Sequence, residues 1–320
     1  MRLGTVFAAG LVLAASSCVP AMPPEATTHP LKAPAAAAAP CPACPTEGEI
    51  AAEAYRLRRA LRAAVPQGRL LARDRDRLWI ELAKKALALR SIAIGRPQLL
   101  VVVNRNPAVQ RLAVVLADPR GPWRVIGGSK VSTGEAHRYG YFITPTGVFR
   151  HTGEIRDYRA LGTKNAHGIR GLGVKGMRVW DFGWQKARRG WEPGSGEIRL
   201  LMHATDPIYL APLLGRPASK GCIRIPAAMN RFLDHYGVLD REYDELARYD
   251  EGYREVLSPD AQPTFLAGDK LIVVDSRLRL APPLARRRCR RRAAIARRSA
   301  ALRSAPTIRF PRRGDRAPVR

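Results

Sequence analysis

Between Gly95 and Ser276, apolar and β-branched residues occur in short runs separated by turn residues, and this pattern restricts the fold more than any other feature. Such runs, ending at glycine, proline and polar residues, are typical of strands. We therefore predict a mainly β fold, a mixed and mostly antiparallel β domain with a few short helices. The predicted strands are residues 99–103, 112–116, 123–126, 141–143, 198–202 and 270–275.

Two segments ahead of this region have helical periodicity. Apolar residues recur at helical spacing in residues 47–65 and again in residues 74–94, among many arginines and lysines. A Pro-Gln-Gly sequence at 66–68 separates them, so the segment 47–95 is predicted to form a helical hairpin. One more helix is expected at 227–236.

Residues 153–196 show only weak periodicity and are rich in glycine, arginine and tryptophan. Long irregular segments inside a compact domain are more often functional than not. We therefore expect this segment to be a substrate-facing loop or a lid.

The N-terminal residues 1–18 have the order of a secretory signal peptide, with Arg2, an apolar run and small residues before Cys18. The run is too short to span a bilayer. Residues before Cys18 resemble the lipobox of bacterial lipoproteins, so we expect an exported protein of the periplasm or cell envelope. Lipid anchoring through Cys18 and ordinary signal cleavage nearby are the two alternatives. Residues 19–46 are rich in proline and alanine and are predicted to form an extended linker.

The formal charge of +28 is concentrated in part at the C-terminal end. Residues 285–320 contain fourteen arginines and a single acid, Asp315, and are predicted to be a disordered tail. Anionic envelope polymers or anionic lipid are the expected partners of such a tail in an exported protein. Nucleic acid is not expected, because no nucleic-acid-binding signature is present. A solvated tail without a specific partner is the other interpretation.

The cysteines are too few and too scattered for a disulfide framework, and no cofactor or metal site is expected. Cys41 and Cys44 have the spacing of a redox motif but lie among proline and alanine, which favours a linker disulfide or free thiols. A zinc site would need two more cysteines at matching spacing. Four histidines without a motif are interpreted as surface or loop residues: His137, His151, His167 and His235.

One cysteine has a chemical context. Cys222 follows Ser219, Lys220 and Gly221 on a predicted tight turn, where neighbouring backbone N–H groups can converge as an oxyanion hole. A thiol needs a base to attack, and His203, at the end of a predicted strand, is the candidate. By themselves these residues could also be a small buried cysteine and a structural histidine.

This segment resembles the signature of the L,D-transpeptidase catalytic domain, also called the YkuD domain. The family pattern has a His-Gly-Thr triplet and then a Ser-His-Gly-Cys turn, followed by an apolar residue and arginine or asparagine. A second element, Thr-Pro-x-Gly-x-Phe, matches residues 144–149, and the resemblance covers roughly residues 97–276. The residues that match the signature are His203, Thr205, Ser219, Gly221, Cys222 and Arg224.

Two positions depart from the family pattern. Ala204 replaces a glycine, which adds a methyl group where the backbone approach is tight, and Lys220 replaces a histidine, which keeps a cation near the thiol and could favour the thiolate. Arg224 has two alternatives, binding a substrate carboxylate or holding the turn through backbone carbonyls. Thr144 and Pro145 are expected to shape a turn and not to take part in chemistry.

The resemblance implies a peptidoglycan L,D-transpeptidase. Cys222 would attack the carbonyl of the L-centre of diaminopimelate in a tetrapeptide stem and expel the terminal D-Ala, with His203 as the base. The amides of Gly221 and Cys222 would bind the oxyanion. An amine of a second stem would then give a 3-3 cross-link, a protein lysine would give protein anchoring, and a free D-amino acid would give exchange. The alternatives are an L,D-carboxypeptidase, with water as acceptor at the same site, and a polyanion-binding envelope protein that works through its arginine-rich tail.

Overall fold

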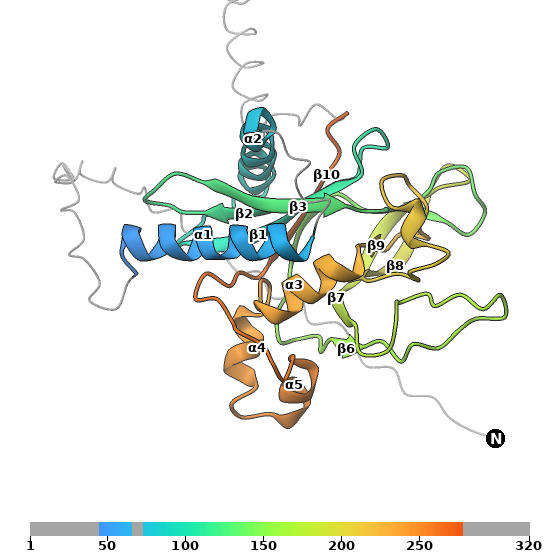
Figure 1. Cartoon of the computed structure of the whole chain (residues 1–320). Coiled ribbons are helices and arrows are strands. Elements are labelled where there is room, and N and C mark those ends of the chain that lie inside the picture. The colour runs from blue at the N-terminus through green and yellow to red at the C-terminus, as the bar shows by residue number, and fades with distance from the viewer. Residues whose placement is uncertain (1–44, 66–72, 278–320) are drawn as a thin grey trace, which may run out of the picture. The chain divides into compact units, whose positions relative to one another are not determined.

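A computed structural model describes residues 45–65 and 73–277. Outside the described residues lie the predicted signal peptide with Cys18, most of the predicted linker with Cys41 and Cys44, the Pro-Gln-Gly sequence at 66–68, and the predicted tail 285–320 with Cys289. The mainly β class is confirmed, because two mixed sheets form the body of the fold (Figure 1).

The first sheet has the strand order β3-β2-β1-β10-β5. β1 and β10 pair in parallel, and the other neighbours are antiparallel. Every residue of β1 is buried, because this central strand is apolar on both faces and both faces are covered. The strands are β1 (Gln98–Asn104), β2 (Arg111–Ala117), β3 (Arg124–Lys130), β5 (Gly147–Arg150) and β10 (Lys270–Val274).

The second sheet has the order β4-β7-β8-β9, with β6 paired to β7. β8 and β9 are parallel, and the other pairs are antiparallel. The strands are β4 (Phe142–Ile143), β6 (Tyr158–Arg159), β7 (Arg178–Arg189), β8 (Ser195–His203) and β9 (Ile223–Arg224).

The two N-terminal helices, α1 (Glu47–Ala64) and α2 (Arg73–Leu89), form where the periodicity predicts them. Their expected packing as a hairpin is wrong, because they cover opposite faces of the first sheet (Figure 1). Leu57 and Leu61 of α1 belong to the cluster that contains Leu99 on one face of β1. Trp79 of α2 belongs to the cluster that contains Leu100 on the other face. A sheet that is apolar on both faces needs cover on both, and one helix supplies each layer.

Three short helices follow the cysteine segment: α3 (Ala227–His235), α4 (Arg241–Leu246) and α5 (Glu251–Val256). The prediction of a helix at 227–236 is confirmed, whereas α4 and α5 were not predicted. Met229 and Leu233 of α3 enter the same core as α1 and both sheets. No helix in the described part of the chain is both long and apolar enough to cross a membrane.

The segment 153–196 is not one irregular loop. It contains β7, in which the first six residues are buried, and Trp180 of that strand is fully buried. Residues 160–177, which we call the covering loop, form its longest stretch without helix or strand. The sequence pattern missed β7 because its first half is buried on both faces and its second half is mostly polar, so neither half alternates clearly.

Candidate functional site

The four residues from Ser219 to Cys222, the cysteine turn, are fixed by two buried hydroxyl groups. The Ser219 hydroxyl donates to the carbonyl of Cys222 at 2.6 Å and accepts from the Gly221 N–H at 3.1 Å. Gly221 has a φ of +132°, and a Cβ there would lie 2.8 Å from Cδ1 of Ile198. The backbone conformation therefore favours glycine at this position.

Thr144 supplies the second hydroxyl from a distant part of the chain. It accepts from the Gly134 N–H at 2.8 Å and donates to the Gly221 carbonyl at 2.7 Å. The Thr144 side chain is fully buried. The Thr-Pro element thus has the expected turn-shaping role, and it acts directly on the cysteine turn.

Strand pairing brings His203 to the cysteine. His203 at the end of β8 pairs with Arg224 of β9, and Cys222 lies two residues before Arg224. Because paired residues point to the same side of a sheet, His203 and Arg224 share one face of the second sheet, which we call the site face, and Cys222 directly precedes β9 at its edge.

The His203 ring is prepared to accept a proton. Its Nδ1 contacts the carbonyl oxygen of Ala204, so Nδ1 carries the proton and Nε2 is left as the acceptor. Burial lowers the pKa of His203 to about 4, and the charge on Arg224 contributes in the same direction. The imidazole is therefore neutral at pH 7.

The Cys222 thiol is half-buried, and its sulfur lies 3.9 Å from the carbonyl oxygen of Arg199. Burial raises the pKa of the thiol, whereas the Leu201 N–H and the charge on Arg224 oppose this shift. Both groups are therefore neutral at pH 7, Cys222 as a thiol and His203 as an imidazole. In such a pair the proton leaves sulfur for the histidine as the sulfur attacks.

The remaining predicted residues take different positions. Arg224 donates to the carbonyl of Ala218 at 2.8 Å, which matches its turn-holding alternative. The Lys220 ammonium lies over the Tyr141 ring, 5.8 Å from its centroid, and the cation that lowers the Cys222 pKa is Arg224. The buried Thr205 hydroxyl has no hydrogen-bond partner among the described residues.

The Gly221 amide is not free for an oxyanion hole, because its N–H donates to the Ser219 hydroxyl. This corrects the expectation that Gly221 and Cys222 act together. The Cys222 N–H lies near its own sulfur, where it lowers the pKa of the thiol. The Leu201 N–H also lies near the sulfur, so these two are backbone donors beside the nucleophile.

An ion pair on the site face was missed by the sequence reasoning. Arg199 of β8 donates from Nε to Oδ2 of Asp181 at 2.6 Å, and the exposed fractions of the two side chains are 50% and 0%. Asp181 lies opposite Leu201 in the β7–β8 ladder, on the same face as His203. The sequence does show that Arg199, Leu201 and His203 alternate along one strand and so point to one side. It does not show that Asp181 lies on the neighbouring strand, which is needed to predict the ion pair.

The covering loop packs over the site face. Its Leu172 and Val174 contact the cluster that contains Val179 and Ala204. A Cβ on Gly173 would lie 2.9 Å from that of Ala204, so the loop accommodates the methyl group of Ala204 through a glycine, whose φ is +93°.

Asp206 fastens this loop to the segment after the histidine. Its Oδ2 accepts from the Arg170 N–H at 3.0 Å, and its Oδ1 accepts from the amides of Ile208 and Tyr209. These backbone N–H groups lower the pKa of Asp206. The loop borders a pocket of 380 Å³ that includes Tyr158.

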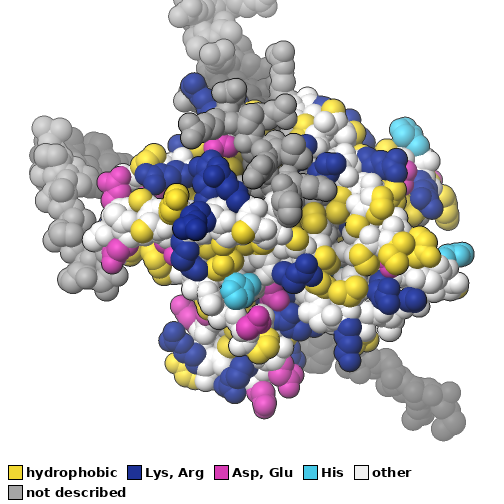
Figure 2. Space-filling model, viewed as in Figure 1, with side chains coloured by type: hydrophobic (Ala, Val, Ile, Leu, Met, Phe, Trp, Pro, Cys, Tyr) yellow, Lys and Arg dark blue, Asp and Glu magenta, His cyan; other side chains and the backbone are white. Residues whose placement is uncertain are grey.

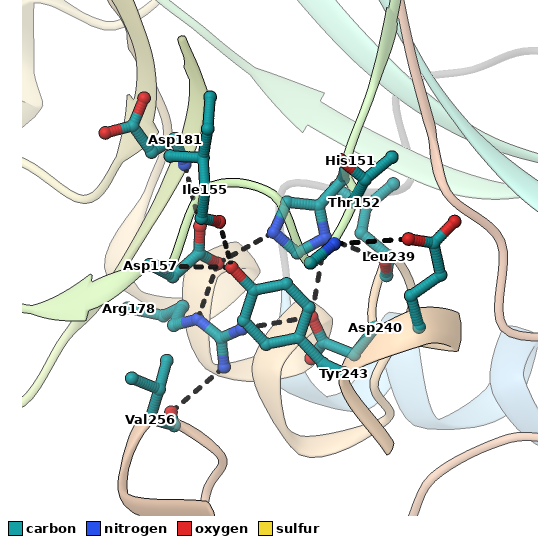
Figure 3. A network of polar contacts seen from close by, with 12 residues as sticks. His151, Thr152, Ile155, Asp157, Arg178, Asp181, Leu239, Asp240, Tyr243 and Val256 are labelled. Carbon is teal, nitrogen blue, oxygen red and sulfur yellow. Dashed lines mark hydrogen bonds and ion pairs between the residues drawn. The ribbon is translucent and has the colours of Figure 1, made fainter. Parts of the chain in front are cut away.

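A second polar cluster joins side chains from β7, from α4 and from the segment after β5 (Figure 3). Asp157 accepts from Nε2 of His151 and from Nε of Arg178, both at 2.9 Å. Arg178 also donates to Asp240 at 3.1 Å, and the Tyr243 ring stacks on His151 with centroids 4.5 Å apart. We call these five residues the buried network.

The buried network is held by charge pairing. Burial lowers the pKa of His151, but the charges of Asp157 and Asp240 outweigh it and raise that pKa overall. Ligand atoms of His151, Asp157 and Asp240 lie within 4.8 Å of one another, as in a metal site. Arg178 already binds both carboxylates, so the protein supplies the cation itself.

The network also reaches the site face. Oδ1 of Asp157 accepts from the Asp181 N–H at 2.9 Å, and the Asp181 carboxylate binds Arg199. The two polar groups are therefore one continuous chain of contacts that fixes the position of Asp181.

The four histidines without a motif have different surroundings. His137 and His167 are exposed and His235 is half-buried, as the surface or loop interpretation requires. His151 is fully buried, which corrects that interpretation for this residue. The sequence offered no sign of it, because its partners come from distant segments.

No family model matches this chain, and a search of curated proteins finds no match either. Function is therefore argued from the geometry and chemistry of the site.

Proposed function

We propose that this protein is a cysteine acyltransferase of the L,D-transpeptidase type, with Cys222 as nucleophile and His203 as general base. One observation carries the proposal. Cys222 lies on a turn fixed by Ser219 and Thr144, directly before the strand that pairs with β8 at His203, a neutral histidine whose Nε2 can accept a proton. The mixed β fold and the order of the two sequence elements support the resemblance to the YkuD domain.

The first half-reaction forms a thioester. The Cys222 sulfur attacks the carbonyl carbon of diaminopimelate in a tetrapeptide stem, and the thiol proton passes to Nε2 of His203. The tetrahedral oxyanion accepts from the Cys222 N–H. Collapse breaks the peptide bond, and His203 returns the proton to the departing amine of D-Ala.

The second half-reaction releases the enzyme. An acceptor amine attacks the thioester, His203 takes its proton, and the sulfur leaves and recovers a proton. An amine from a second stem gives a 3-3 cross-link, and this acceptor follows from the family resemblance. The covering loop, fastened by Asp206, would shield the thioester from water.

The partners and the location follow from the substrate. Peptidoglycan stems are the proposed partner, and the signal-like residues 1–18 fit an enzyme of the cell envelope. Figure 2 shows Lys and Arg side chains spread over the visible face of the described residues, among apolar and acidic ones. A basic surface of this kind suits an anionic wall polymer.

A covalent probe tests the proposal. Full-length protein is incubated with a carbapenem, and the intact mass is recorded over time. Wild-type protein is expected to gain the mass of one acyl group, and Cys222→Ala protein to gain none. An equal adduct on Cys222→Ala protein, or the absence of an adduct on folded wild-type protein, would count against the nucleophile.

A further inference from the structure

Arg199 is the strongest feature of the site face that the proposed reaction does not use. Its side chain is half exposed, while that of its partner Asp181 is fully buried. Only Nε is engaged, at 2.6 Å from Oδ2 of Asp181. Within the described residues, the two terminal nitrogens of Arg199 have no hydrogen-bond partner, so the end-on edge of the guanidinium faces solvent.

The position of this guanidinium is fixed in advance. Oδ1 of Asp181 accepts from the Gly183 N–H at 2.9 Å, and the Asp181 N–H donates to Asp157 of the buried network. Asp181 therefore cannot rotate away without breaking these contacts. An arginine held through Nε presents its two terminal N–H₂ groups as a rigid fork, the geometry that binds a carboxylate through two bonds.

Arg199 also lies next to the nucleophile. Its backbone carbonyl is 3.9 Å from the Cys222 sulfur, and its side chain extends on the same face as His203. Burial raises the pKa of Tyr158, and the charges of Asp181, Cys222 and Arg199 also act on it.

We propose that Arg199, oriented by Asp181, binds a free carboxylate of the substrate beside the scissile bond. The ligand class is a peptide carboxylate, which a stem peptide offers both on its terminal D-Ala and on diaminopimelate. The proposal rests on the proposed function and deepens it, since it makes a negatively charged group next to the reacting carbonyl a requirement of the donor.

Arg224 is the competing candidate for this role. Its guanidinium donates to the Ala218 carbonyl, and burial lowers its pKa, so it is committed to the cysteine turn. Arg199 likewise has one structural bond, to Asp181, but its side chain is exposed, whereas that of Arg224 is half-buried. The specificity-determining role therefore falls to Arg199.

The test compares acid and amide forms of one donor. Substrates are a tetrapeptide stem, the same peptide ending in D-alaninamide, and the same peptide amidated on diaminopimelate. Cleavage is followed by mass spectrometry with wild-type, Arg199→Gln, Arg199→Lys and Arg62→Gln proteins. Arg62 is an exposed residue of α1 and controls for the loss of one positive charge.

For wild-type protein, kcat/KM on one of the two amides should be lower than on the unmodified tetrapeptide stem by a factor on the order of 10 to 100, mainly because KM rises. The affected amide identifies which carboxylate is bound. For Arg199→Gln, kcat/KM on the unmodified peptide should be lower than that of wild type by a similar factor. Its kcat/KM values on the unmodified peptide and on the affected amide should be equal. Arg199→Lys should fall between them, because it keeps the charge but not the fork. Arg62→Gln should match wild type.

Two failures are distinguishable. If wild-type protein cleaves the peptides through Cys222 but its acid-to-amide ratio equals that of Arg199→Gln, the carboxylate subsite is wrong and the proposed function stands. If folded wild-type protein cleaves none of the three peptides, the proposed function and the subsite both fall.

Discussion

The protonation state of His203 sets the pH range in which the enzyme can work. An ordinary histidine has a pKa near 6.5, whereas burial lowers that of His203 to about 4. A base with a lowered pKa stays neutral as the pH falls, so activity should persist well into the acid range. At the other end, burial raises the pKa of Cys222, so the thiol remains protonated at neutral pH.

The size of the effect follows from the two pKa values. At pH 5 a histidine with a pKa of about 4 is roughly nine-tenths neutral, whereas one with a pKa of 6.5 is about 3% neutral. The rate of acylation at pH 5 should therefore be within a factor of about two of its plateau. An unperturbed histidine would lower it by about thirtyfold.

The assay measures acylation of the full-length protein by a carbapenem, through intact mass, from pH 4 to pH 9. Ultraviolet absorbance of the thiolate is recorded in parallel, because a thiolate and imidazolium pair would give a similar acid limb. We expect an acid limb near pH 4 and no thiolate at pH 7, judged against Cys222→Ala protein. An acid limb near pH 6.5, or a thiolate at pH 7, would refute the reasoning.

Three substitutions test the supports of the site. Thr144→Val removes both hydrogen bonds of the Thr144 hydroxyl, so the free energy of unfolding should fall by about 1–3 kcal/mol and acylation should be slower. Thr144→Ser keeps the hydroxyl and should be near wild type. Denaturant unfolding measures the stability, and the rate of adduct formation measures the acylation. Gly173→Ala should displace the covering loop and lower turnover, whereas Gly171→Ala, which has open space, should not. Arg178→Met leaves buried carboxylates without their cation and should destabilise the protein by about 3–5 kcal/mol in denaturant unfolding; an unchanged midpoint would contradict this.

Strands β1, β2 and β10 of the first sheet can be predicted from sequence, because their apolar runs are uninterrupted and end at turn residues, whereas β5 of the same sheet was not predicted. β1 at Gln98–Asn104 and β2 at Arg111–Ala117 agree closely with their predicted spans. The arrangement of α1 and α2 could not be predicted in this way. An amphipathic period shows that a helix has one apolar face, but it does not show which surface covers that face.

In the candidate site, too, local contacts can be predicted from sequence and contacts between distant segments cannot. A short motif places Cys222 and Ser219 on one turn, and local sequence is enough to predict this. The bond from Thr144 to Gly221 and the pair of Asp181 with Arg199 join segments far apart in the chain. Contacts of this kind depend on strand register, which a single sequence does not reveal.

The most direct test of the central claim is the release of D-Ala from a purified tetrapeptide stem by wild-type, Cys222→Ala and His203→Ala proteins, with intact mass read in parallel. Wild-type protein should release D-Ala and pass through a thioester, and Cys222→Ala should do neither. His203→Ala should be slower by a factor on the order of 10² or more and form some adduct at higher pH, where the thiolate fraction rises. Turnover retained by Cys222→Ala would contradict the nucleophile assignment and the mechanism built on it.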